Sequence, residues 1–177
     1  MTVLITGATS GIGQQLVADY INEGETVYAC GRNKEKLQRL KEQTQGAGKL
    51  HTLMFDVTDQ AATLAALEQV SEVDCVILNA GVCEYIDKPG DIEGPLFQRV
   101  FAANYFGVVH CVEGILPQLK QGARLVIVDS MARLFPFTRA EAYASSKAAV
   151  HYLANTLKVD LAPQGIQVIS VAPGFVT

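Results

Sequence analysis

Much that would point to other protein classes is missing from this sequence. Only 18% of its 177 residues are charged whereas 49% are apolar, which argues against a disordered chain. It has no run of Lys or Arg, and its net charge is −4. Because phosphate recognition depends on clustered positive charge, we expect no nucleic-acid partner.

Membrane and export signals are lacking too. No segment comes near the run of about 18 apolar residues that spans a bilayer. The first residues, 1–7, have no basic stretch, and their apolar run soon ends at a glycine, unlike a signal peptide. We therefore expect a cytoplasmic protein with no membrane partner.

The sequence also lacks a metal-ligand pattern. The four cysteines, Cys30, Cys75, Cys83 and Cys111, form neither a CxxC pair nor a metal-binding spacing, and we expect them to be reduced and structural. The three histidines, at positions 51, 110 and 151, are scattered, with no carboxylate pair to complete a metal site. We expect them to be structural or surface residues and predict no metal.

What is present is a regular alternation of apolar strands and amphipathic helices. The length fits one domain, 1–177. The expected strands are 2–6, 25–30, 49–55, 73–78, 124–129 and 165–171, and the expected helices are 11–23, 33–43, 58–70, 96–119 and 141–161. Strands that are apolar throughout indicate a parallel sheet covered on both faces. We therefore predict a Rossmann-type, doubly wound, three-layer α/β/α fold with ligands at the carboxyl ends of its strands.

A glycine-rich turn, TGATSGIG at positions 6–13, links the first strand to the first helix. Such a turn lets backbone N–H groups approach a pyrophosphate, and the helix N-terminus adds a favourable dipole. A glycine cluster alone is weak evidence, because turns favour glycine for their own geometry. Its place between a strand and a helix is what indicates a nucleotide site.

The TGxxxGxG spacing of this turn resembles the single-domain branch of the short-chain dehydrogenase/reductase family, whose extended branch has TGxxGxxG. The family's other landmarks follow in order: Asp56-Val57, Asn79-Ala80-Gly81, Asn104, Ser130, the YxxxK pair Tyr143 and Lys147, and Pro173-Gly174. One departure is Asp129, which precedes Ser130 where many family members carry a second serine. The resemblance covers the whole chain.

The resemblance implies a role for each catalytic residue. Tyr143 would be the general acid/base, and Lys147 would lower its pKa and bind the nicotinamide ribose. Ser130 would hydrogen-bond the substrate oxygen, and Asn104 would hold a water that relays protons to Lys147. The cofactor-binding residues implied are Gly7, Thr9, Ser10, Gly11, Ile12, Gly13, Arg32, Asp56, Val57, Asn79, Ala80, Gly81, Tyr143, Lys147, Pro173, Gly174, Val176 and Thr177.

The residue types suit this chemistry. Hydride addition to a carbonyl makes an alkoxide that must be protonated, and a phenol with a pKa of about 10 can supply the proton. Tyr143 and Lys147 are four residues apart and so share one helix face. A nearby ammonium, together with an oxidised nicotinamide, would lower the pKa of the phenol towards the working pH. Taken alone, the pair would be an ordinary tyrosine and a solvated lysine.

The end of the second predicted strand indicates the nucleotide. NAD-preferring folds place an acidic residue there for the ribose 2′-hydroxyl, whereas this chain has Gly31 and Arg32. Arg32 could pair with a 2′-phosphate through a charge-assisted bond. We predict NADP(H) as the preferred cofactor, with NAD(H) use and a merely stacked or solvated Arg32 left open.

The pocket candidates Met131, Leu134, Phe135 and Phe137, with the loop 82–88, are mostly apolar and suggest a small carbonyl or alcohol with an apolar part. Family members continue past this chain's last residue through a substrate-covering loop, a helix and a seventh strand. An end at Thr177 would leave an unpaired sheet edge, so we expect further residues.

Helices 96–119 and 141–161 carry more apolar surface than one sheet face would cover. By resemblance they pair across a twofold axis, which predicts a homodimer or homotetramer. The alternative is that further residues cover the surplus within one subunit. Two rival functions stay open at this point: a non-catalytic NAD(P)-sensing protein on the same fold, and a sugar-nucleotide epimerase or dehydratase, which the TGxxxGxG spacing opposes.

Overall fold

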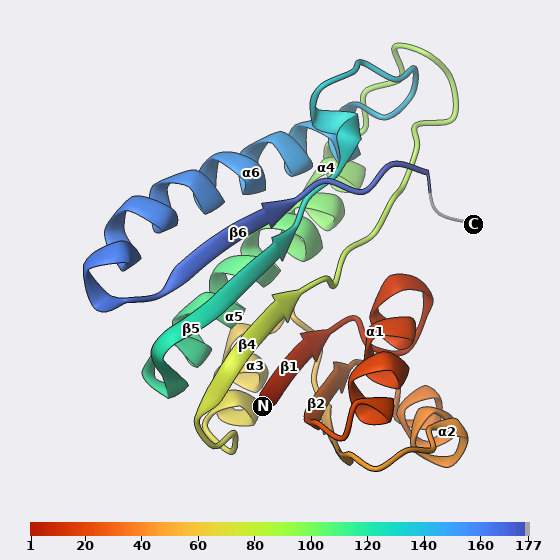
Figure 1. Cartoon of the computed structure of the whole chain (residues 1–177). Helices are drawn as coiled ribbons and strands as arrows, with labels where there is room; N and C mark the ends of the chain where they lie inside the picture. Colours follow the sequence, from red (N-terminus) through yellow and green to blue (C-terminus); the bar gives the residue numbers. More distant parts are fainter. Residues whose placement is uncertain (176–177) are drawn as a thin grey trace.

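A six-stranded parallel sheet, in the order β3-β2-β1-β4-β5-β6, runs through the computed structural model of the protein, which describes residues 1–175 (Figure 1). The strands are β1 (Thr2–Thr6), β2 (Thr26–Gly31), β3 (Lys49–Met54), β4 (Val73–Leu78), β5 (Leu119–Val128) and β6 (Gln167–Val171). All five strand pairings are parallel. After β3 at one edge, the chain returns to the middle of the sheet and adds β4 on the other side of β1. Sheets of this kind bind ligands where the strand order reverses, between β1 and β4.

Helices cover both faces of the sheet, which confirms the predicted doubly wound α/β fold. They are α1 (Gly11–Asn22), α2 (Lys34–Gln43), α3 (Gln60–Leu67), α4 (Gly94–Phe101), α5 (Gly107–Ile115) and α6 (Glu141–Leu161). Figure 1 shows α1 and α2 on one face and α4, α5 and α6 on the other. The two faces bury separate apolar clusters because successive strand residues point to opposite sides.

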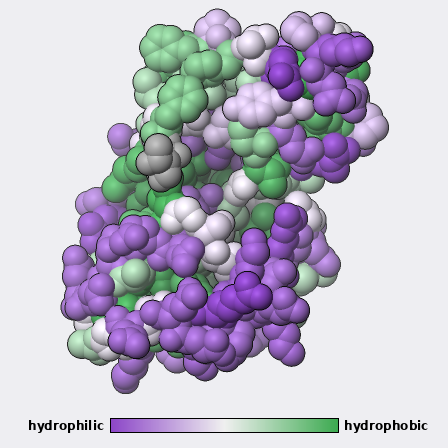
Figure 2. Space-filling model, turned by 90° about the vertical axis from the view of Figure 1, so that its right-hand side faces the viewer, coloured by the Kyte–Doolittle hydropathy of each residue, from purple (hydrophilic) through white to green (hydrophobic). Residues whose placement is uncertain are grey.

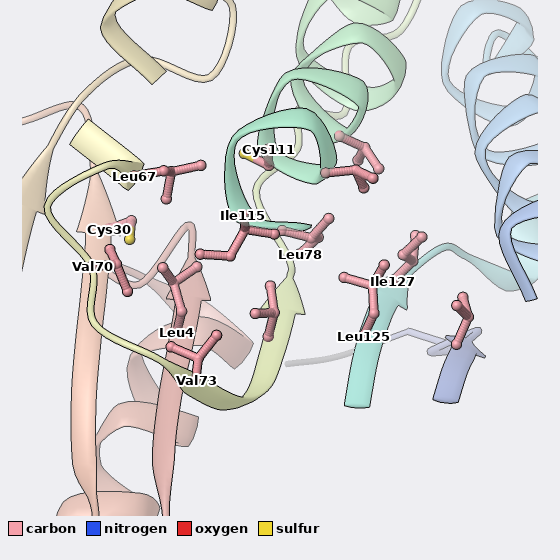
Figure 3. Close-up of a cluster of buried hydrophobic side chains, with 14 of the residues drawn as sticks. Leu4, Cys30, Leu67, Val70, Val73, Leu78, Cys111, Ile115, Leu125 and Ile127 are labelled. Atoms are coloured by element: carbon pink, nitrogen blue, oxygen red, sulfur yellow. The ribbon is translucent and has the colours of Figure 1, made fainter. Parts of the chain in front are cut away.

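The larger cluster lies between the sheet and helices α3, α5 and α6. Its buried members include Leu4, Leu78, Leu125 and Ile127 from the strands and Ile115 from α5 (Figure 3). On the opposite face, side chains of β1, β2 and β4 pack against α1 and α2. These strands are apolar throughout because both of their faces are covered.

The helix predicted over 96–119 is present as one unbroken helical run, Gly94–Gln118, but it is not α-helical throughout. The structure has α4, a π-helical turn at Ala102–Phe106, α5, and a short 3₁₀ turn at Leu116–Gln118. Pro95 stands at the start of α4, where its missing N–H costs nothing. The apolar periodicity continues through all these segments, so it predicts helix without revealing the change in winding.

This helical run also corrects the expectation that no segment approaches membrane-spanning character. Gly94–Gln118 is long and apolar enough, by length and composition alone, to cross a membrane. Of its most apolar stretch, 44% is buried inside the protein. Val108 and Ile115 are nearly or fully buried in the larger cluster, and Val100 is fully buried in a smaller cluster with Ile86 and Ala142. Packing inside the protein therefore accounts for part of the apolar character.

Several element ends differ from their predicted positions. The fifth strand begins at Leu119, five residues before the predicted Arg124, and passes through Gly122 in the left-handed region (φ +82°). A polar, glycine-containing start hides this part of the strand from sequence patterns. The third helix begins at Gln60 instead of residue 58, because Asp59 caps it by accepting a hydrogen bond from the Ala62 N–H (3.0 Å), and it ends at Leu67, three residues early. The second helix, predicted to begin at residue 33, begins at Lys34, because Asn33 caps it by accepting from the Lys36 N–H (2.9 Å).

Candidate active site

The glycine-rich turn between β1 and α1 is shaped by close backbone contacts. Gly7 has a φ of +64°, and a Cβ atom on Gly13 would lie 2.3 Å from the Gly7 carbonyl oxygen. No side chain other than hydrogen fits at Gly13 without a backbone shift. Ser10 precedes α1 in an extended conformation and makes no side-chain capping bond. The first N–H groups of α1 are thus left for another acceptor, as a bound pyrophosphate requires.

The end of β4 is tied to this turn. The buried Thr6 hydroxyl accepts hydrogen bonds from the Asn79 and Ala80 N–H groups, each at 3.0 Å. The Asn79 side-chain amide donates to the Thr6 and Gly7 carbonyls at 3.2 and 3.3 Å. Two adjacent strand ends therefore form one rigid floor at the point where the sheet reverses.

A cavity of about 200 Å³ opens over this floor. Of the predicted cofactor residues, Gly7, Thr9, Ser10, Arg32, Asp56, Val57, Ala80 and Gly81 line it. Sequence reasoning missed Asn33 and Lys36, which line it as well. Lys36 lies in the first turn of α2, four residues after Arg32. A second cation at this short distance from Arg32 is the sequence signal that could have identified it.

Two of the lining residues form an ion pair. Arg32 Nη1 lies 3.4 Å from Asp56 Oδ2, and both side chains are exposed to solvent. Burial raises the pKa of Asp56, but hydrogen bonds from Thr58 and Arg32 outweigh it, and the net pKa falls below the usual value. The carboxylate thus stays ionised beside Arg32, an arrangement the sequence did not predict.

The predicted catalytic groups meet in a second cavity of about 230 Å³, which adjoins the first through Gly81 and Val82. Ser130 stands just after β5, and Tyr143 and Lys147 lie in the first half of α6. The other predicted residues that line it are Ile12, Asn79, Gly81, Pro173 and Gly174. The fold therefore brings the serine, tyrosine and lysine to the edge of the nucleotide cleft.

Burial raises the pKa of Tyr143 above its usual value of 10.0, although a hydrogen bond with Ser130 acts in the opposite direction. Burial also lowers the pKa of Lys147 to about 8, despite the charge of Asp129. The Lys147 ammonium lies 6.0 Å from the Tyr143 ring centre and donates to the Val128 carbonyl at 2.9 Å. The predicted lowering of the Tyr143 pKa by Lys147 is therefore not found here. The predicted lowering of the Tyr143 pKa by an oxidised nicotinamide applies to the complex with the cofactor and stays a prediction.

Asn104 lies in the π-helical turn and lines neither cavity. Its amide is engaged by protein groups: Oδ1 accepts from the Val82 N–H (2.7 Å), and Nδ2 donates to the Val82 carbonyl (2.9 Å) and the Ser146 hydroxyl (2.9 Å). It thereby fixes the loop after β4 to α6 beside Lys147. The water relay stays a prediction.

A third cavity, of about 590 Å³, shares Ser130 and Tyr143 with the second. The predicted substrate residues Met131, Phe135 and Phe137 line it, whereas Leu134 does not. From the predicted loop 82–88 only Cys83 and Tyr85 contribute. Figure 2 shows apolar side chains gathered at the upper left of one face, whereas the upper right and most of the lower part are hydrophilic. The lining residues of the third cavity are largely apolar and aromatic.

Some predicted residues lie elsewhere. Gly11 and Gly13 shape the turn without lining a cavity, and Val176 and Thr177 lie outside the described residues. All four cysteines are free, but Cys83, unlike the three buried ones, is exposed. Within residues 1–175, no group of three or more His, Cys, Asp or Glu side chains is placed to hold a metal ion.

The sequence matches the profile of a family described as short chain dehydrogenase over residues 1–177. It is 31% identical over 180 residues to sulfoacetaldehyde reductase 2 of Chromohalobacter salexigens, a match that covers 98% of this chain and 71% of that protein. It is 33% identical over 179 residues to serine 3-dehydrogenase of Agrobacterium fabrum, with the same coverage.

Solved structures are similar over nearly the whole chain. The closed form of a serine dehydrogenase complexed with NADP+ is 26% identical with a TM-score of 0.89, covering 100% of this chain and 73% of that one. A 3-oxoacyl-[acyl-carrier protein] reductase of Brucella melitensis with bound NAD is also 26% identical, with a TM-score of 0.89, and the match covers 98% and 70% of the two chains. The two structures carry different nicotinamide nucleotides.

Proposed function

On the premise that this chain belongs to the short chain dehydrogenase family and is an NAD(P)-dependent oxidoreductase, we propose that it uses NADP(H) to reduce a ketone or aldehyde, or to oxidise the matching alcohol. The observation that carries the proposal is the meeting of Ser130, Tyr143 and Lys147 in one cavity that adjoins the nucleotide cleft. A protein that only sensed the nucleotide would have no use for this group.

Each of the three side chains has its own role in carbonyl reduction. The bound cofactor supplies a hydride to the carbonyl carbon. The Ser130 hydroxyl donates a hydrogen bond to the carbonyl oxygen, and the Tyr143 phenol gives that oxygen its proton. Lys147 lies on α6, one helical turn after Tyr143, and lines the same cavity. It holds the nicotinamide ribose and, when protonated, favours the phenolate form that Tyr143 takes after giving up its proton. In alcohol oxidation the same proton returns to Tyr143.

Two cations support the choice of NADP(H). Arg32 and Lys36 both line the first cavity, and Gly31 places no acidic side chain there. A 2′-phosphate would compete with Asp56 for the Arg32 guanidinium, whose fork suits a phosphate as well as a carboxylate. NAD(H) stays the alternative cofactor.

The third cavity supports a carbonyl substrate with an apolar part. Met131, Phe135 and Phe137 line it, and no lysine or arginine does so among residues 1–175. Two arginines nearby in sequence are bound elsewhere: Arg133 Nε donates to Asp129 (2.9 Å) and Arg139 Nε to the Ile86 carbonyl (2.7 Å). Among residues 1–175, a substrate bearing a sulfonate or carboxylate would find no cationic side chain to pair with its charge in this cavity.

We also propose that the protein is at least a homodimer. Phe106 and Tyr152 are 52% and 72% exposed. With Phe101, Tyr105 and Leu153 they line a shallow apolar hollow between the π-helical turn and α6. A second copy of the same surface would cover these rings across a twofold axis.

The experiment that tests the function is turnover with NADPH on a panel of neutral aryl ketones, aliphatic ketones and anionic aldehydes. We expect the neutral compounds to be reduced with the higher kcat/KM. Tyr143→Phe should lose turnover by about a hundredfold or more while keeping its NADPH affinity. A wild-type protein that binds NADPH tightly but reduces nothing would support the sensing alternative, and a Tyr143→Phe variant with normal turnover would overturn the role of Tyr143.

A further inference from the structure

Asp129 is the only acidic residue among 1–175 that is buried. It stands between β5 and Ser130, and its side chain is fully enclosed. Its backbone N–H donates to the Val171 carbonyl at 2.8 Å. A carboxylate removed from water costs free energy unless donors compensate it, so its partners should have a role.

Three segments converge on one oxygen of this carboxylate. Oδ2 accepts from the Ser170 hydroxyl on β6 (2.6 Å), from Nε of Arg133 in the 3₁₀ turn Met131–Arg133 (2.9 Å), and lies 2.8 Å from Nδ1 of His151 on α6. The second oxygen, Oδ1, is buried without a partner. The carboxylate thus joins two strand ends, a turn and a helix, at the cost of one unsatisfied oxygen.

The orientation of His151 shows that it is not a base aimed at the substrate cavity. The Asn155 amide nitrogen lies 3.0 Å from Nε2 and donates to it, so Nδ1 carries the proton that goes to Asp129. Both ring nitrogens are therefore used within the network. His151 follows Lys147 by one helical turn, so the network lies next to the catalytic pair on α6.

Hydrogen bonds connect the network to the catalytic residues. The Arg133 N–H donates to the Ser130 carbonyl (3.2 Å), and the Ala132 N–H donates to the Ser130 hydroxyl (3.1 Å). On the other side of Asp129, the Val128 carbonyl accepts from Lys147 (2.9 Å). Displacing Asp129 would therefore move the backbone that carries Ser130 and the acceptor that holds Lys147.

We propose that Asp129 is a positioning residue: through Arg133, His151 and Ser170 it holds Ser130 in place, and it supplies a buried negative charge beside Tyr143 and Lys147. This inference rests on the proposed function, in which those three residues act on a carbonyl. The inference goes beyond the proposed function because Asp129 itself touches neither substrate nor cofactor in that mechanism.

The electrostatics of the site agree with this geometry. The charge of Asp129 raises the pKa of Tyr143 and, against the larger effect of burial, that of Lys147. Cys83, on the loop after β4, also raises the pKa values of Tyr143 and Lys147. Ser130, just after β5, lowers the pKa of Tyr143 through its hydrogen bond. Removing the Asp129 charge should therefore lower both pKa values.

The test is Asp129→Asn, which keeps the shape and removes the charge. We expect the alkaline limb of kcat/KM for reduction to move down by about 0.5 to 1 pH unit. NADPH affinity at neutral pH should stay within about twofold, because Asp129 does not line the first cavity and its side chain, at the edge of the second, is fully enclosed. Ser170→Ala is the matched control: it removes one hydrogen bond to Asp129, keeps the charge, and should leave the limb in place even if stability falls.

A second readout needs no turnover. The phenolate of Tyr143 can be titrated by ultraviolet absorbance as the difference between each protein and its Tyr143→Phe version, and the same downward shift is expected. Asp129→Ser, with the residue that many family members carry, serves if Asp129→Asn does not fold. An unchanged titration midpoint in either folded variant overturns the inference. If the wild type shows no turnover but Asp129→Asn still lowers the midpoint of the Tyr143 titration, only the proposed function is contradicted.

Discussion

At the scale of single residues, the proposed preference for NADP(H) rests on two cations, Arg32 just after β2 and Lys36 in the first turn of α2. Removing the charges of Arg32 and Lys36 together, as Arg32→Ala with Lys36→Ala, should weaken NADPH binding about tenfold or more and leave NADH binding unchanged. The reason is that only NADPH carries the 2′-phosphate that these cations would bind. Isothermal titration with both nucleotides measures the effect.

Lys41→Ala is the matched control for this pair, because it removes a charge from the same helix at an exposed position outside the cavity. It should affect neither nucleotide. Equal losses for NADPH and NADH in the double variant would show that Arg32 and Lys36 do not read the 2′-phosphate.

A second prediction at this scale concerns pH. Burial lowers the pKa of Lys147 to about 8, so the ammonium is charged below that value and neutral above it. Because the proposed mechanism needs the charged form, kcat/KM for reduction should fall as the pH rises through about 8. Lys147→Arg keeps its charge at every accessible pH, and any activity it retains should lack this limb. A wild-type rate that rises through the same range would contradict the prediction.

At the scale of elements, the glycine-rich turn is held by contact between its own backbone atoms. Gly13→Ala would bring a Cβ atom to 2.3 Å from the Gly7 carbonyl oxygen, which forces the start of α1 to move. We expect a loss of about 1–3 kcal/mol in the free energy of unfolding and a clear loss of NADPH affinity. Urea unfolding and nucleotide titration check the two effects.

Gly94→Ala, at the start of α4, is the comparison variant, because a Cβ there meets nothing within 4 Å. It should keep both stability and nucleotide binding. If Gly13→Ala behaves like it, the turn is more adaptable than its contacts indicate.

Elements also show how far sequence reasoning reaches. Apolar runs such as Val73–Leu78 identify buried strands, and Asn33 identifies a helix start by its own chemistry. The π-helical turn around Asn104 leaves no such signal, because its residues continue the apolar periodicity of the helices on either side. The partners of Asp129 were equally out of reach, since they come from three segments that only the folded sheet brings together.

At the scale of the whole molecule, the exposed aromatic hollow predicts self-association. Light scattering at micromolar concentration should give at least twice the subunit mass. Tyr152→Glu should reduce the mass to that of one subunit, because a carboxylate would be buried against the partner's apolar rings. Val159→Glu is matched to it: both side chains are 72% exposed on α6, but Val159 does not line the hollow. A wild-type mass of one subunit would refute the prediction.

The strand order also bears on how the protein is made. Because the sheet grows outwards from β1, first through β2 and β3 and then through β4, β5 and β6, each strand that leaves the ribosome finds its neighbour already synthesised. The residues that line the first cavity end at Ala103, so all of them are translated before Ser130, Tyr143 and Lys147. A nascent chain of this protein would then carry the two cations proposed to bind the 2′-phosphate well before the residues proposed to hold the nicotinamide ribose and to act on the substrate.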